Sequence, residues 1–118
     1  MNLTKDLDAA TLAFDAEAGS ARLRFSGDEL FFKGHFPEGP VLPAVVQVAA
    51  AVHFAGRALG REVRLAEVSR AKFMNPTGPG RELVMAMSLE SGEDGRTKVK
   101  ASIRDAGKEV AELTLRVL

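Results

Sequence analysis

The pattern of apolar and polar residues sets one long apolar segment apart from the rest of the chain. Residues 44–59 are apolar at almost every position, and only Gly56 weakens the segment as a helix. Pro43 stands directly before it, and proline is favoured in a first helical turn because its missing N–H would have no partner there. Arg57 and Arg61 lie near the other end, where the helix dipole favours cations. The pattern predicts a helix over residues 44–59, and a helix that is apolar all round is buried.

Alternation of apolar and polar side chains, which is typical of half-buried strands, marks much of the remaining sequence. Residues 21–25 alternate in this way, and residues 29–33 are expected to form a short extended segment. Residues 1–10 are polar, and we expect them to be only partly ordered. After the helix, four further strands separated by glycine-containing turns are predicted, over residues 62–71, 83–89, 97–103 and 110–117. A buried helix followed by a run of antiparallel strands is an α+β pattern.

Length, charge and cysteine content narrow the class of protein. A chain of 118 residues is expected to form one domain, residues 1–118. Sixteen Lys and Arg balance sixteen Asp and Glu, which argues against nucleic acid or an anionic membrane as a partner. The absence of cysteine excludes disulfides and a thiol nucleophile. Two histidines 18 positions apart make a poor zinc site.

Targeting signals are not recognisable in the sequence. The first residues carry charges where a signal peptide needs an apolar run. The longest apolar stretch, residues 41–55, is too short to span a bilayer. We therefore expect a soluble cytoplasmic protein that does not bind membranes.

His35 is the main candidate for chemistry, because it lies in a turn-rich segment just before the apolar helix. Gly34 precedes it, and Gly39 and Pro40 follow. An imidazole titrates near neutral pH and so exchanges protons under ordinary conditions. The free N–H groups at the start of the predicted helix point back toward this turn, where they favour an oxyanion forming on a carbonyl. The segment indicates proton transfer beside an anion-stabilising helix end.

The segment GHFPEGPVLPAVVQ, which starts at Gly34, resembles the signature of the hot-dog-fold 3-hydroxyacyl-acyl-carrier-protein dehydratases, roughly GHFPxxPxxPGVxxxE(or D)A. A second segment, RAKFMNPTGPGREL, resembles a later strand of that family, which reads K/R-F-x-x-P-x-x-P-G-D. The match is in register from about Phe31 to the end of the chain. The Leu-Pro and Val-Val-Gln variants are most similar to the thioester dehydratases of aryl polyene pigment clusters. The resemblance implies a hot-dog fold, a curved antiparallel sheet wrapped around a long central helix and normally paired with a second copy.

The resemblance also implies a reaction, the elimination of water from a 3-hydroxyacyl thioester without metal or redox cofactor. The substrate is carried on phosphopantetheine, either of an acyl carrier protein or of coenzyme A. His35 occupies the position of the family's base. The oxyanion donor is expected to be the backbone N–H of Ala44 or Val45, directly after Pro43, although the family has glycine at position 44. Phe36, beside the base, is expected to contact the substrate.

The family's acid is missing from this sequence. A glutamate or aspartate normally lies 14 positions after the histidine, and Ala49 stands there. Gln47 does not titrate, and Glu38 belongs to the turn. His53, one helical turn beyond Ala49, is the only titratable candidate, but it is displaced by about 6 Å along the helix. Because a histidine in an apolar helix is more often a core or interface residue, that is our default interpretation of His53.

Two functions follow from this departure. The first is a dehydratase acting on acyl thioesters in fatty-acid or polyene synthesis, impaired or dependent on a partner. The second is a non-catalytic subunit that binds an acyl carrier or an acyl chain in a heterodimer with an intact dehydratase. In this family each site resembles a composite of two subunits, so a partner's acid would complete a site around His35 while the site containing Ala49 stayed inactive. A hot-dog thioesterase is less favoured, because it also needs a carboxylate.

Basic side chains near the second motif have two interpretations. They are Arg61, Arg64, Arg70 and Lys72. Cations beside a tunnel mouth would help an acidic acyl carrier protein to dock. A strand with alternating charges is as often only a solvated face.

Overall fold

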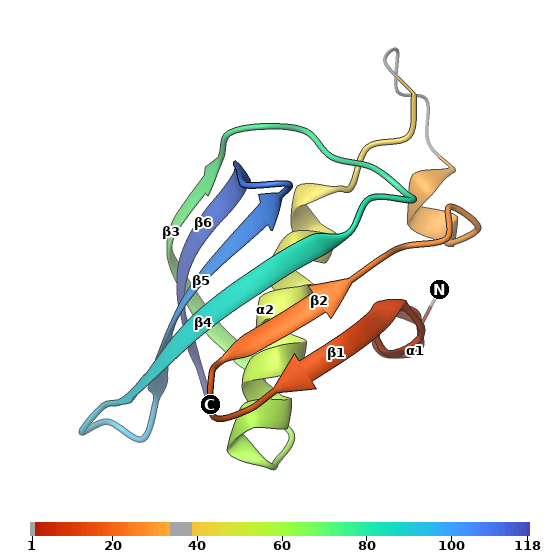
Figure 1. Cartoon of the computed structure of the whole chain (residues 1–118). Helices are drawn as coiled ribbons and strands as arrows, with labels where there is room; N and C mark the ends of the chain where they lie inside the picture. The colour runs from red at the N-terminus through yellow and green to blue at the C-terminus, as the bar shows by residue number, and fades with distance from the viewer. Residues whose placement is uncertain (1, 34–38) are drawn as a thin grey trace.

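The computed structural model describes residues 2–33 and 39–118 as one antiparallel sheet curved around a central helix (Figure 1). The sheet has six strands in the order β1-β2-β4-β5-β6-β3, so β1 and β3 are its edges. The central helix, α2, lies along the concave face, and the short α1 lies beside β1 (Figure 1). The elements are α1 (Leu3–Ala10), β1 (Thr11–Asp15), β2 (Ser20–Leu23), the 3-10 helix η1 (Leu30–Phe32), α2 (Ala44–Leu59), β3 (Leu65–Phe73), β4 (Leu83–Ser91), β5 (Thr97–Asp105) and β6 (Lys108–Val117).

Helix α2 has the bounds that the sequence predicts. Pro43 is its N-cap, with an extended backbone, and Gly60 ends it in the left-handed conformation, with φ of 71°. A left-handed residue after a helix is favoured as glycine because no Cβ crowds the backbone. One side of the helix packs into the sheet and buries Val46, Ala51 and Phe54. The other side is not covered, and Val45 remains 70% exposed.

The core lies between α2 and the inner face of the sheet. Alternate residues of β4, β5 and β6 point inward, as a two-residue period requires, and are fully buried, among them Met85, Val99, Ile103, Leu115 and Val117. All four predicted strands after the helix are present, and each differs from its predicted bounds by a few residues. Uncertain strand ends are usual when bounds are read from sequence patterns.

Two expectations for the first third of the chain were wrong, and one strand was missed. Residues 1–10 were expected to be only partly ordered, but residues 3–10 form α1, whose N-terminus is capped because the side-chain oxygen of Asn2 accepts a hydrogen bond from the Lys5 amide at 3.0 Å. Strand β1, residues 11–15, was not predicted. Residues 29–33 contain a 3-10 helix instead of an extended segment, because Phe32 is buried against Phe25 in the core.

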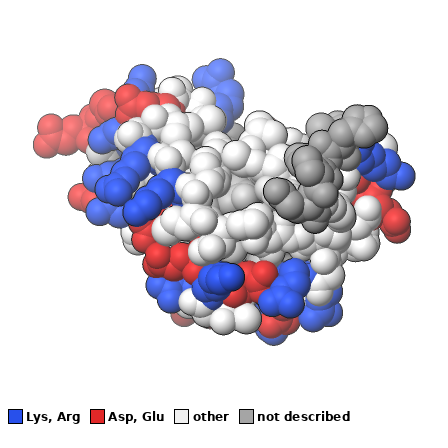
Figure 2. Space-filling model, turned by 90° about the horizontal axis from the view of Figure 1, so that it is seen from above, with Lys and Arg blue, Asp and Glu red and all other residues white. Residues whose placement is uncertain are grey.

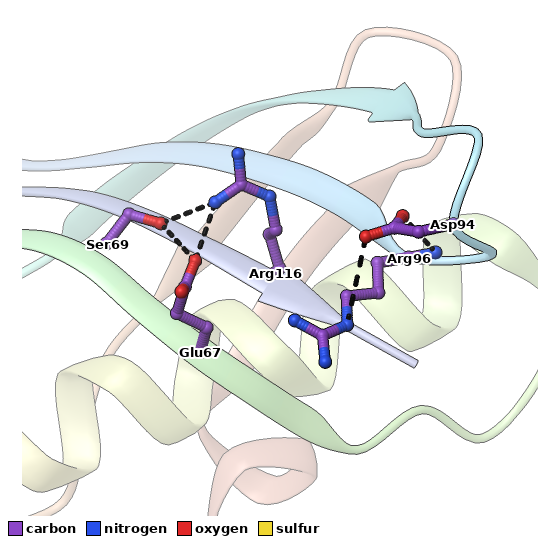
Figure 3. A network of polar contacts seen from close by, with 5 residues as sticks. All are labelled: Glu67, Ser69, Asp94, Arg96 and Arg116. Atoms are coloured by element: carbon purple, nitrogen blue, oxygen red, sulfur yellow. Dashed lines mark hydrogen bonds and ion pairs between the residues drawn. The ribbon is translucent and has the colours of Figure 1, made fainter.

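Edge strand β3 breaks the simple alternation of strand residues. Its pairing with β6 shifts register twice, between Leu65 and Glu67 and between Val68 and Arg70. These bulges turn Glu67 and Ser69 to the outer face, where both contact Arg116 of β6, at 2.6 Å and 2.8 Å (Figure 3). Hydrogen bonds from Ser69 and Arg116 lower the pKa of Glu67. The polar contacts therefore hold the edge strand from its outer side.

The inner side of β3 is apolar and uncovered. Val68 pairs with Leu115 and Phe73 with Ala111, both of which are buried, so these β3 residues face inward. Nevertheless Leu65, Val68 and Phe73 are 44%, 42% and 44% exposed. The described chain thus covers these three side chains only in part, and Leu65 lines the same pocket as residues of α1 and α2. Figure 2, which looks down on one end of the molecule, shows an uncharged area at its centre with charged side chains around its left and lower margins.

Gly19, in the turn between β1 and β2, offers a test of how closely this turn sits against β4. Its φ is 65°, its carbonyl accepts from the Met87 amide at 2.7 Å, and a Cβ there would overlap the Met87 carbonyl oxygen. Gly95 has a φ of 80° but no atom within 4 Å of an added Cβ. Both alanine variants strain the backbone, so we expect Gly19→Ala to lower the free energy of unfolding by roughly 1–3 kcal/mol more than Gly95→Ala, through overlap alone. Urea unfolding of the two variants measures the difference, and equal losses would mean that the turn moves freely away from β4.

Candidate functional site

A groove of about 740 Å³ runs along the uncovered side of α2. One wall is α1, through Leu3 and Leu7, and its floor is α2, through Val45, Val48 and Val52. The segment 60–65 closes the end near the C-terminus of α2. An apolar groove with a few polar side chains at defined places is the usual form of a small-molecule site.

The structure brings together two of the candidate residues on this groove. Ala49 and His53 both line it, one helical turn apart on the same face of α2. Val45, a candidate oxyanion donor, lines it nearer the helix start. His35 and Phe36 lie outside the described residues.

The N-terminal end of α2 has free backbone donors. The carbonyl of Pro43 accepts from the amides of Val46 and Gln47, at 3.1 Å and 3.2 Å. The Ala44 and Val45 amides donate no hydrogen bond to residues 2–33 or 39–118. Both residues are exposed. These two N–H groups stand at the positive end of the helix dipole, which favours a negatively charged oxygen.

Gln47, which the sequence analysis set aside because it does not titrate, has a structural role. It is only 5% exposed, and its Nε2 donates to the carbonyl of Leu42 at 3.2 Å. Its Oε1 is buried with no partner among the described residues. The side chain therefore ties the first turn of α2 to the segment that leads into it.

His53 is held by a residue that the sequence analysis did not single out. Its Nε2 lies 2.8 Å from Oδ1 of Asp8 in α1, and its side chain is 14% exposed. Arg57 lies 4.0 Å from the same carboxylate and stacks over the ring of Phe14, at 4.6 Å from its centre. The only signal for α1 in the sequence is a weak one, apolar residues at positions 3, 7 and 10 after a capping asparagine, and α1 places Asp8 beside His53.

The basic side chains separate into two places. Arg61 and Arg64 line the groove at the C-terminal end of α2. Arg70 and Lys72 lie on the outer face of β3, opposite Thr114 and Glu112 of β6. The four cations do not form one patch around the start of α2.

Other kinds of site have little support. Among the described residues, no three metal-binding side chains come together. The described helices include none with the length and apolar content needed to cross a bilayer.

Comparison with known families decides the membership of the chain. A family model for the ApeI-like proteins, described as ApeI dehydratase, matches residues 12–113. The chain belongs to the ApeI-like dehydratase family. The family predicted from the sequence is therefore confirmed.

Curated relatives of this ApeI-like chain are 3-hydroxyacyl-[acyl-carrier-protein] dehydratases named FabZ. The protein of Caldanaerobacter subterraneus is 31% identical over 93 residues, which cover 73% of this chain and 65% of the relative. That of Klebsiella pneumoniae is 31% identical over 99 residues, covering 76% and 66%. The matched region thus spans about two thirds of the length of these relatives.

Solved structures share the fold. A chain of the dehydratase heterocomplex ApeI:P from Xenorhabdus doucetiae superposes with a TM-score of 0.74 at 20% identity, covering 91% of this chain and 95% of that one. The fluoroacetyl-CoA thioesterase FlK gives a TM-score of 0.59 at 20% identity, covering 70% and 64%. The predicted α+β hot-dog fold is confirmed.

A second polar cluster, formed by Thr77, Arg81 and Asp105, lies near the segment that leads into α2. Arg81 binds both carboxylate oxygens of Asp105 at 2.8–3.1 Å, and the Thr77 hydroxyl donates to Oδ2 at 3.0 Å. Hydrogen bonds from Arg81, together with that from Thr77, lower the pKa of Asp105 below its usual range. Nothing in the sequence around Asp105 indicates a partner 24 residues away.

The pKa shift of Asp105 predicts a pH dependence of stability. Because the pKa is lower in the folded state, the stabilisation is complete above the ordinary aspartate pKa and is lost as the pH falls through the folded pKa. Asp105→Asn removes this contribution. We therefore expect the difference in unfolding free energy between the parent protein and Asp105→Asn to be largest near neutral pH and to shrink on acidification below about pH 4. Urea unfolding at a series of pH values measures it, and a constant difference would show that protonation of Asp105 is not linked to folding.

Proposed function

We propose that this chain acts as a dehydratase of 3-hydroxyacyl thioesters, with His35 as the base and the start of α2 as the oxyanion site. The observation that carries the proposal is the pair of amides at the start of α2, Ala44 and Val45, which donate no hydrogen bond to residues 2–33 or 39–118; Val45 also lines the groove. They follow directly after the histidine motif in the chain. Membership of the ApeI-like family and the FabZ relatives support the same reaction.

The reaction needs three groups. A base removes the C2 proton, and His35 is proposed for this role. Negative charge then builds on the thioester oxygen, where the Ala44 and Val45 amides would stabilise it. An acid must protonate the departing C3 hydroxyl so that it leaves as water. Phe36 and Pro43 are proposed to contact the substrate around these groups.

This chain does not offer a convincing acid of its own. Ala49 stands at the family's acidic position and lines the groove. In the described part of the chain, the one carboxylate that lines the groove is Glu62, beyond the C-terminal end of α2. His53 is bound to Asp8, in keeping with a structural histidine. The acid is therefore proposed to come from another subunit.

The substrate is proposed to be an acyl thioester of an acyl carrier protein or of coenzyme A, and no metal or redox cofactor is required. The groove walls from α1 and α2 are apolar, as an acyl chain needs. The FabZ relatives are named as dehydratases of 3-hydroxyacyl-[acyl-carrier-protein]. The proposed reaction would be a step of fatty-acid or polyene synthesis.

A second candidate function is a non-catalytic subunit that binds an acyl carrier or acyl chain in a heterodimer. Two observations favour it: the replacement of the acid by Ala49, and the similarity of the fold to a chain of the dehydratase heterocomplex ApeI:P. In such a heterodimer, the partner would carry out the reaction with its own residues, and neither His35 nor the site with Ala49 would take part. The two candidates differ in whether His35 takes part in turnover.

The first prediction from the proposed function is that the chain does not remain monomeric. A dimer that covers the inner side of β3 and the exposed side of α2 should bury more than ~1,000 Å². Val68→Arg introduces a charge on this inner side and is expected to shift light scattering at micromolar concentration toward the monomer. Val84→Arg, at a 39% exposed position on the outer face of β4, is the matched control. A monomeric parent protein, or equal effects of both variants, would contradict this interface.

The second prediction concerns turnover by the isolated protein. Loss of one member of an acid–base pair costs a factor of roughly 10²–10⁴ in rate, so we expect feeble dehydration of a 3-hydroxyacyl thioester or none. Ala49→Glu is expected to raise kcat, with some loss of stability because a carboxylate replaces a methyl group on the apolar floor of the groove. His35→Ala in the Ala49→Glu background should abolish the gain.

Three outcomes separate the candidates. A gain with Ala49→Glu that His35→Ala removes supports the dehydratase. Failure of both the parent and Ala49→Glu, with tight binding of an acyl carrier protein, supports the non-catalytic subunit. Strong turnover by the unmodified protein that is lost in His53→Ala would instead make His53 the acid.

A further inference from the structure

We infer that Thr77, Arg81 and Asp105 are positioning residues for the N-terminal end of α2, acting through the segment 39–43. The inference rests on the proposed function only in that this helix end is taken to bind the thioester oxygen. None of the three residues lines the groove. They lie outside the groove and connect the β3–β4 loop to the end of β5. We call this set of contacts among Thr77, Arg81 and Asp105 the brace.

The base of the brace is Asp105, at the end of β5. Its side chain is 13% exposed, whereas that of Arg81 is 57% exposed. Two nitrogens of Arg81 bind its carboxylate, and a planar guanidinium held in this way has a fixed orientation. The third contact is the Thr77 hydroxyl, and Thr77 is only 7% exposed. Asp105 thereby fixes two points of the β3–β4 loop.

The fixed loop then holds the segment before α2. The Thr77 carbonyl accepts the Leu42 amide at 2.7 Å. The two backbones are so close that a Cβ on Gly78 would come within 2.7 Å of the Pro40 carbonyl oxygen. In Figure 1 this loop, drawn in green to teal, passes above the start of α2. The contact sits on residues 40 and 42, immediately before the N-cap Pro43.

Leu42 is held from both sides. Its N–H is bound by Thr77 and its carbonyl by Nε2 of Gln47, and its side chain is 4% exposed. With both peptide groups and the side chain fixed, the backbone has little freedom to rotate before Pro43. The Ala44 and Val45 amides come one and two residues after the N-cap, so their directions depend on this anchor. An error of about 1 Å in such donors is enough to cost on the order of 10²-fold in rate.

The residue at position 81 departs from the family motif. Arg81 stands where the family motif P-G-D has an aspartate. In this chain the cation is on the loop and the anion, Asp105, is on β5. The brace depends mainly on a close charge pair, and the inference therefore predicts that exchanging the two charges preserves the ion pair and loses only the contact of Asp105 with the Thr77 hydroxyl.

Hydrogen exchange of the Leu42 amide tests the brace directly and without any activity. We expect Asp105→Asn and Arg81→Asp to speed its exchange by on the order of tenfold, through local opening. Arg81→Lys keeps the charge but loses the two-nitrogen contact, and a smaller increase is expected. The double variant Arg81→Asp/Asp105→Arg should restore most of the slow exchange, because it regains the ion pair but not the acceptor for the Thr77 hydroxyl. Glu67→Gln, which breaks the ion pair with Arg116 at the far edge of the sheet, is the control and should leave Leu42 unchanged.

A kinetic measurement separates positioning from general stability. The measurement uses the assembly, homodimer or heterodimer, that turns over a 3-hydroxyacyl thioester. There the Asp105 and Arg81 single variants should lower kcat about 10- to 100-fold with little change in KM, and the exchanged pair should recover most of the lost kcat. Glu67→Gln should leave kcat unchanged. If Asp105→Asn does not fold, both Leu42 exchange and kcat are measured on Arg81→Lys instead.

The results that overturn the inference are distinct from a failure of the proposed function. Unchanged Leu42 exchange in all the single variants, an equal change in Glu67→Gln, or no recovery in the exchanged pair would each overturn the brace. Faster exchange with unchanged kcat in an active assembly would overturn its role in positioning. If no assembly turns over the substrate, the dehydratase proposal fails, while the exchange pattern alone still confirms or refutes the brace.

Discussion

The structure depends on one mismatch of surfaces: α2 is apolar on nearly every side, but a single curved sheet covers only one of them. Burial of Val46, Ala51 and Phe54 against the sheet supplies the main hydrophobic contact of the fold. The remaining apolar surface, which includes Val45, Val48 and Val52, becomes the groove floor. The same shortage of cover leaves the inner side of β3 open. The groove and the inner side of β3 are therefore two parts of one apolar surface that the fold leaves exposed.

Around that surface, polar residues control where the ends of the elements lie. Asn2 starts α1, Asp8 ties α1 to α2 through His53, and Gln47 ties α2 to Leu42. None of these contacts is strong on its own, since a net hydrogen bond contributes about 1 kcal/mol. Their importance is geometric. They decide how wide the groove is and which way the first amides of α2 point.

Sequence reasoning succeeded where the signal is local and failed where it depends on distant partners. The bounds of α2 were predictable because Pro43, the apolar run and Gly60 are neighbours in the sequence. The strands after it were predictable from alternation, although the bulges of β3 were not, because a bulge shows only in the pairing. Helix α1 was missed because few apolar residues mark it. The contacts of His53 with Asp8 and of Arg81 with Asp105 join residues 45 and 24 positions apart, and no local pattern reports them.

The two bulges of β3 also affect which chains can add to this edge. A flat edge strand with regular alternation accepts almost any extended segment, which is the usual route to unwanted aggregation. In β3 the inward residues are spaced irregularly, at Leu65, Val68, Ala71 and Phe73, and the bulges increase the local twist. A strand that adds to β3 in full must follow the same irregular path. The edge therefore rejects ordinary strands while remaining open to a chain with a matching irregularity, as a second copy or a close homologue has.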